Sequence, residues 1–371
     1  KAGRVVGAKR GLEKVAEKVF GRRGRVFEKG RPLHFIHPAY EAIENFLLWP
    51  STRTGIAPHV RDPQDVKRFM SMVMLCVMPC IAASIYFFGW RIVPMIVVTY
   101  ASGLIVEWIF AIIRKEGINE GFFVTGLLYP LILPPATPLW MVSLGIVFGV
   151  VVGKEVFGGT GRNLFNPALV GRCFLAIAYP VQLTAGWIAP IAAWPGRLGQ
   201  YVDASSVDAM TKATPLGMAK ANIPTDTLDL LLGNTAGCAG ETSAVLIIGA
   251  GLLLLATRII SWRTVFGMLG TVAIFSGILH AVDADKFAPA GFHMLAGGLL
   301  FGAIFMATDP VTSPITRHGR PASGNLIGVT TVLIRCLTRY DQGVLFATRL
   351  GIIFAPLLAD VFIRLHRRRL A

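Results

Sequence analysis

Long apolar stretches recur along this chain and leave few folds open to it. Several are long enough to cross a hydrocarbon core about 30 Å thick. Charged residues make up only 15% of the chain, against about a quarter in soluble domains. With the weaker runs included, ten candidate spans result: 69–88, 92–113, 122–133, 139–152, 168–193, 243–256, 265–279, 292–306, 326–337 and 345–363. The sequence therefore predicts an all-α polytopic membrane protein.

The ten spans divide into two halves of five, residues 69–193 and 241–363, joined by a polar loop at 194–240. Because five is odd, repeated halves would have opposite topology. The third span of each half is short and ends in a proline-rich break, at Pro134-Pro135 and at Pro310 to Pro314. Interrupted spans at matching positions point to a site near the membrane midplane.

The net charge of +15 is unevenly distributed. Basic residues cluster in an arm at 1–68, in the loops on one side of the predicted spans and in a tail at 364–371. By the positive-inside rule that side is cytoplasmic and carries both termini. This distribution excludes nucleic acid as a partner and indicates a membrane surface instead.

A knot of polar and small residues, KEVFGGTGRNLFNPALVGR at 154–172, lies among the apolar runs. Polar groups are costly there, so this segment is expected to line a cavity for a polar ligand. Asn163 and Asn166 offer both donors and acceptors that could read a heteroaromatic edge. Capping of broken helices explains the two asparagines equally well.

Acidic residues in or beside the spans are few. Glu107 lies well inside an apolar run, where an acid by default suggests a cation or proton path. Asp309 follows Thr308 at the end of a span, where capping competes evenly with ion binding, and Asp360 lies near the cytoplasmic end of the last span. The five cysteines form no CxxC pair and no Cys/His ligand set, so we expect no protein-held metal.

Taken together, these segments resemble the NqrB component of the sodium-translocating NADH:quinone oxidoreductases, in the NqrB/RnfD family, over nearly the whole chain. The strings that carry the resemblance are long and ordered: residues 59–62, 119–125, 154–172, 208–214 and 306–311.

The resemblance implies a covalent FMN, joined through its phosphate to a threonine by a flavin transferase. Asp208, Thr211, Ala213 and the acceptor Thr214 match the attachment pattern, whereas Lys212 replaces its glycine. Taken alone, this loop reads as an ordinary exposed polar turn. Lys212 either impairs entry of the segment into the transferase or pairs with the flavin phosphate.

The family is also expected to hold a non-covalent riboflavin and to contribute to a ubiquinone site. Asn163, Asn166 and Thr125 match family positions and are the expected riboflavin contacts. Of a glycine pair associated with quinone and inhibitor access, Gly103 is kept and Leu104 stands in the second place. We therefore expect a narrower pocket and altered inhibitor sensitivity.

The implied role is electron transfer without a catalytic residue of this chain's own, from NADH oxidised elsewhere through flavins to ubiquinone, coupled to sodium export. Glu107, Asp309 and Asp360 are the expected ion path. The implied setting is the bacterial inner membrane, in a six-subunit complex with an NADH-oxidising flavoprotein and a second FMN-bearing component.

Two alternatives stay open. The RnfD component of the Rnf ferredoxin:NAD oxidoreductases shares these membrane motifs and a covalent flavin, but its chains usually begin close to the first span. A channel or transporter with two five-helix halves would carry no flavin, and the threonine motif argues against it.

Overall fold

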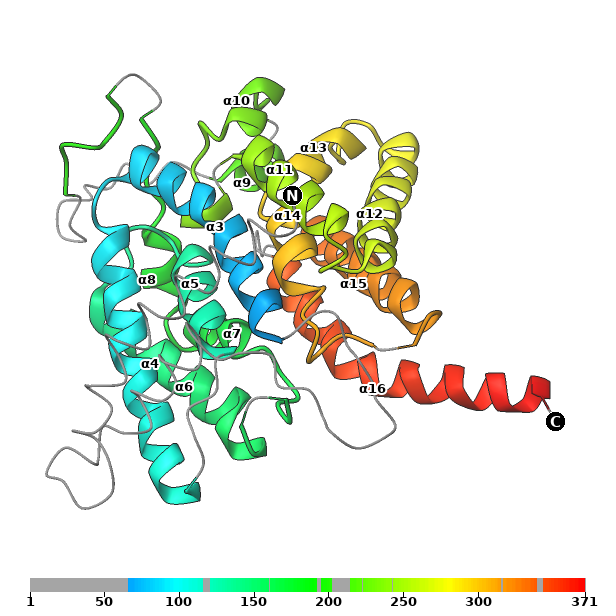
Figure 1. Cartoon of the computed structure of the whole chain (residues 1–371). Helices are drawn as coiled ribbons and strands as arrows, with labels where there is room; N and C mark the ends of the chain where they lie inside the picture. The colour runs from blue at the N-terminus through cyan, green and yellow to red at the C-terminus, as the bar shows by residue number, and fades with distance from the viewer. Residues whose placement is uncertain are drawn as a thin grey trace, which may run out of the picture.

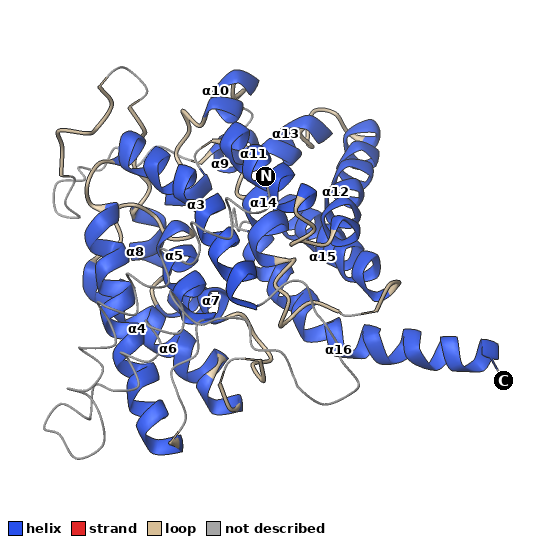
Figure 2. Ribbon diagram, viewed as in Figure 1, coloured by secondary structure: helices blue, strands red, loops and turns tan. Residues whose placement is uncertain are grey.

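The computed structural model describes residues 66–115, 121–159, 161–191, 195–201, 214–221, 223–241, 243–314, 316–338 and 343–370. In these residues the chain forms helices joined by turns and loops, without a strand (Figure 2). Nearly all of the predicted basic arm lies outside them, as do Asp208, Thr211, Lys212 and Ala213.

Each predicted span finds a helix or a group of helices. In the first half these are α3 (Val66–Phe88), α4 (Ile92–Arg114), α5 (Gly121–Leu131), α6 (Leu139–Gly153), α7 (Pro167–Ala178) and α8 (Pro180–Ala185), with a short 3-10 turn η2 (Glu155–Phe157) after α6. In the second they are α11 (Ala244–Ala256), α12 (Trp262–Val282), α13 (Ala290–Leu295), α14 (Leu299–Phe301), the π-helical turn η5 (Gly302–Met306), α15 (Gly319–Leu337) and α16 (Gly343–Leu370).

Five of the described helices, α3, α4, α6, α12 and α16, are long and apolar enough to cross a membrane. Large apolar side chains on them face outward, as with Ile105 and Ile113 on α4 and Ile274 on α12. Helices that are apolar on their outer face as well as their inner one are expected in lipid. The chain is a multi-pass membrane protein.

The helices form two groups (Figure 1). In one group α6 packs against α4 and α7, and in the other α15 packs against α12 and α16. The groups meet where α3 packs against α11 and where α7 packs against α16. The last turns of α16, which include the predicted basic tail, continue the helix away from the rest of the molecule (Figure 1).

The structure differs from the predicted spans at three places. The predicted span 168–193 is two helices, because Pro180 begins α8 after Tyr179 leaves the helical conformation. The span 292–306 is interrupted at Ala296–Gly298. The linking loop contains two short helices, α9 (Pro215–Lys220) and α10 (Thr227–Leu232), and the 3-10 turn η4 (Ala239–Glu241).

Close packing of α6 against α7 depends on glycine. A Cβ at Gly149 would lie 2.4 Å from the carbonyl oxygen of Pro167. The neighbouring atom is backbone, so the helices themselves would have to move apart. We expect Gly149→Ala to lower the free energy of unfolding by about 1–3 kcal/mol.

The matched control is Gly249→Ala on the exposed face of α11, where a Cβ would meet nothing within 4 Å. That change is expected to be neutral or slightly stabilising. Melting temperatures of the two variants in detergent check the prediction, which fails if they shift equally.

Candidate functional site

The first helix break leaves backbone carbonyls inside the protein. Helix α5 ends at Leu131 before the Pro134-Pro135 turn. The carbonyl of Ile132 accepts a hydrogen bond from Arg172 Nε of α7 at 3.0 Å, and that of Leu133 accepts from the backbone N–H of Ala239 at 3.0 Å. Arg172 is only 1% exposed. An arginine from the neighbouring helix thus supplies what water cannot.

The second break is held in the same way by a different arginine. Gly297 and Gly298 have φ values of 63° and 66°, which end the helical path between α13 and α14. Arg335 of α15 donates from Nη1 to the carbonyl of His293 at 2.7 Å, and from Nη2 to those of Ala296 and Gly297, both at 2.8 Å.

Glu241 joins the two breaks. It interacts electrostatically with both Arg172 and Arg335, and its Oε2 accepts from the backbone N–H of Cys238 at 3.4 Å. Its carboxylate lies so close to Gly298 that a Cβ there would be 2.1 Å from Oε1. Sequence reasoning treated Glu241 as a helix-start residue, and the structure places it at the junction of the two interrupted segments.

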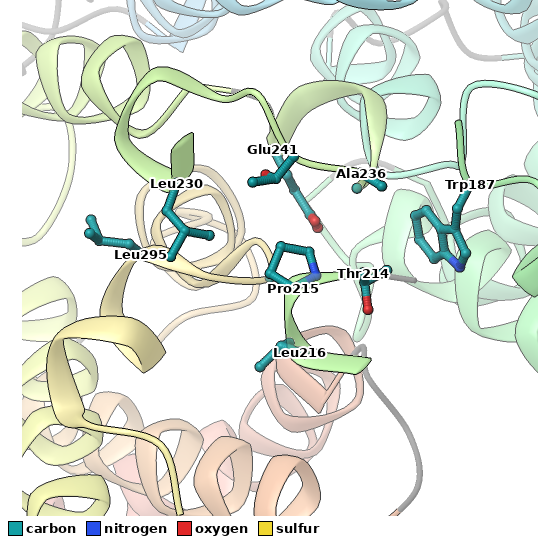
Figure 3. A pocket seen from close by; sticks show the side chains of 11 residues that line it. Trp187, Thr214, Pro215, Leu216, Leu230, Ala236, Glu241 and Leu295 are labelled. Carbon is teal, nitrogen blue, oxygen red and sulfur yellow. The ribbon is translucent and has the colours of Figure 1, made fainter. Parts of the chain in front are cut away.

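A small cavity opens beside this junction, and Thr214 is on its wall (Figure 3). The Glu241 side chain points toward Pro215, and Thr214 lies between Pro215 and Trp187 (Figure 3). The remaining lining residues are Leu216, Leu230, Thr235, Ala236, Gly237, Leu295 and Gly297.

Thr214 has a fixed orientation. It is the N-cap of α9, where its Oγ1 accepts from the backbone N–H of Gly217 at 3.2 Å, and it is 8% exposed. The cavity volume is about 30 Å³, which is room for about one water molecule. The described residues thus fit a phosphoester on Thr214, with the isoalloxazine ring lying beyond the cavity rather than enclosed by it.

The structure brings Asn166 and Asp309 together from opposite halves of the chain. Asn166 caps α7 by accepting from the N–H of Ala168 at 3.0 Å, and its Nδ2 donates to Asp309 Oδ2 at 3.2 Å. Asp309 also accepts from Thr312 Oγ1 at 3.2 Å and from the N–H of Val311 at 3.1 Å. Capping and a contact across the halves are thus combined in one asparagine.

Asn163 and Thr125 make local bonds instead. Asn163 closes its own loop, accepting from the N–H of Gly161 at 3.1 Å and donating to the carbonyl of Phe165 at 3.0 Å. Thr125 Oγ1 donates to the carbonyl of Gly121, one turn earlier in α5, at 3.4 Å.

Glu107 lies in a buried cluster of alternating charges. Lys154, just after α6, forms an ion pair with Glu107, and its Nζ is 3.9 Å from Glu155 Oε1. Glu155 Oε2 in turn pairs with Arg114 Nη1 at 2.7 Å. The side chains of Glu107 and Lys154 are 3% and 5% exposed.

Asp360 is in a different environment from Glu107. It lies on the exposed part of α16 and pairs with Arg364 at 2.8 Å, with half of its side chain exposed. The structure therefore does not place it in a buried ion-binding position.

The two positions of the expected quinone pocket face different neighbours. Gly103 is buried against the ring of Phe122, since a Cβ there would lie 2.1 Å from its Cζ. Leu104, the next residue along the helix, is half-buried and packs on the core.

Among the described residues no group of His, Cys, Asp and Glu could hold a metal ion. Sequence reasoning singled out neither Arg335 nor the pairing of Lys154 with Glu107. A signal was present for both, since a basic residue next to an apolar run needs a buried partner.

The junction gives a stability prediction. We expect Arg335→Met to lower the free energy of unfolding by about 3–5 kcal/mol, because three buried carbonyls and Glu241 lose their cationic partner. Arg364→Met is the control, since its ion pair with Asp360 is exposed and is expected to contribute less than about 1 kcal/mol. Thermal unfolding in detergent measures both, and equal melting temperatures would contradict the role of Arg335.

Comparison with known proteins agrees with this arrangement. The model of the NQR2, RnfD, RnfE family matches residues 53–366. The B-type subunit of the Na(+)-translocating NADH-quinone reductase of Azotobacter vinelandii is 38% identical over 395 residues, covering 93% of this chain and 96% of the relative.

The same subunit of Pseudomonas aeruginosa strain PAO1 is 39% identical over 402 residues, with 93% and 96% covered. That of Chromohalobacter salexigens is 35% identical over 390 residues, with 92% and 93% covered. This chain belongs to the NQR2, RnfD, RnfE family.

Proposed function

We propose that this chain is the NqrB component of a sodium-translocating NADH:quinone oxidoreductase, carrying covalent FMN on Thr214. The observation that carries the proposal is the likeness to such proteins along 93% of the chain. The orientation of Thr214, whose hydroxyl is fixed at the start of α9 on the wall of a cavity, supports it. Asp208, Thr211 and Ala213 would be the remainder of the segment that the flavin transferase recognises.

Thr214 would supply the oxygen of the phosphoester, and the α9 start would hold the phosphate end at a fixed place. Asn163, Asn166 and Thr125 are proposed to contact a non-covalent riboflavin, through the amide and hydroxyl groups that their present bonds leave available. Gly103 and Leu104 are proposed for the ubiquinone side. Flavins, when bound, accept and pass on one or two electrons, which suits transfer from NADH to a quinone.

The chain is proposed to cross the bacterial inner membrane ten times, in two inverted halves with both termini cytoplasmic. The matching contacts of α6 with α4 and α7 and of α15 with α12 and α16 support the two halves. The positions of the basic residues support the orientation. Its partners would be the other members of a six-subunit complex, including the one that oxidises NADH.

The family model also covers the Rnf-type proteins. NADH:quinone activity of the membranes, compared with ferredoxin:NAD activity, separates the two assignments. The arm before the first span favours the quinone-reducing complex.

Flavin attachment gives the direct test. We expect the denatured wild-type band to fluoresce under ultraviolet light, and peptide mass spectrometry to find FMN on the peptide that carries Thr214. Thr214→Val should abolish the adduct, whereas Lys212→Gly should equal or exceed the wild-type yield because glycine restores the family pattern. A dark wild-type band from cells with an active flavin transferase would refute the assignment.

The ion path gives a second test, because Glu107 and Asp309 are buried and half-buried acids without a metal cluster nearby among the described residues. We expect Glu107→Gln and Asp309→Asn each to weaken the sodium dependence of turnover at least several-fold. Asp360→Asn, at the exposed end of α16, should have a smaller effect. If sodium-dependent turnover is unchanged in both buried variants, the path lies elsewhere.

A further inference from the structure

Lys154 is unexplained by a sodium path through Glu107. The ammonium group of Lys154 already neutralises the Glu107 carboxylate, and both side chains are nine-tenths or more buried. A sodium ion and Lys154 therefore compete for the same oxygen atoms. A tethered cation competes as if it were present at millimolar concentration or above.

The cluster contains a second acceptor for Lys154. Glu155 Oε1 is 3.9 Å from its Nζ, so a change of side-chain rotamer brings the ammonium from one carboxylate to the other. Lysine suits this exchange because its charge is compact and its four-carbon stem is flexible.

Arg114, the other partner of Glu155, can leave at low cost. Its side chain is 26% exposed at the end of α4, while that of Glu155 is 7% exposed. When Lys154 turns to Glu155, the guanidinium can turn outward, and the positive charge added by sodium is balanced without an unpaired buried ion.

We propose that Lys154 is the tethered counter-cation of Glu107 and sets the sodium affinity of this chain. Sodium occupies Glu107 when Lys154 moves to Glu155, and sodium leaves when Lys154 returns. Lys154 is in this sense a positioning residue that acts through Glu107. This inference rests on the proposed sodium-translocating function.

The experiment measures the sodium concentration at half-maximal NADH:quinone turnover of the purified complex, together with sodium uptake into proteoliposomes. Lys154→Met is expected to lower the half-saturating concentration at least fivefold, because Glu107 loses its competitor. It should also lower the maximal rate, because sodium release loses its driving partner. Lys154→Arg, which keeps the charge, should stay closer to wild type.

Glu155→Gln should shift the half-saturating concentration in the opposite direction. With the second acceptor neutralised, Lys154 stays on Glu107 and sodium binds more weakly. Lys115→Met is the matched control, because Lys115 is exposed immediately after α4 and beside Arg114. It should leave the sodium dependence within twofold of wild type.

An unchanged or raised half-saturating concentration in Lys154→Met would overturn the inference. If that variant does not assemble, Glu155→Gln decides, and no change or a decrease would overturn it. A wild-type complex whose turnover ignores sodium would instead overturn the proposed function, and this inference with it. The two failures are therefore distinguishable in the wild type alone.

Discussion

A backbone carbonyl that ends a helix within a membrane needs a donor, and lipid offers none. This chain interrupts two helices and meets the need with two buried arginines from neighbouring helices. Arg172 reaches the carbonyl of Ile132, and Arg335 reaches three carbonyls around Gly297. Glu241 interacts with both, so the charges that satisfy the breaks are themselves partly balanced. The positions of α5, α13 and α14 depend on this arrangement.

The junction also determines what surrounds Thr214. Ala239 and Glu241 belong to the same short turn, and this turn is tied to the first break through Leu133 and to the second through Gly298. The cavity wall is built from Glu241, Gly297 and the start of α9. A modification of Thr214 would therefore be placed against the least mobile part of the polar interior, although the residue itself comes from the linking loop.

Much of the fold is predictable from the sequence because apolar length is a strong signal in membrane proteins. The helices at 69–88 and 92–114 and the proline break after α5 were expected from the sequence. The break at Gly297 was not, since two glycines in an apolar run do not show whether a helix bends or stops. Asn166 was expected to cap a helix or read a ligand. Its bond to Asp309 depends on the packing of the two halves, which local sequence does not show.

The two buried charge clusters differ in a way that follows from side-chain chemistry. Arg335 spreads its planar guanidinium over three fixed carbonyls, and movement would leave all three without a donor. Lys154 carries a single compact charge between two carboxylates, and movement exchanges one partner for the other. The first arrangement has one low-energy state and the second has two. A protein that must hold a broken helix and also admit a mobile cation needs both, and this chain places arginine at the breaks and lysine beside Glu107.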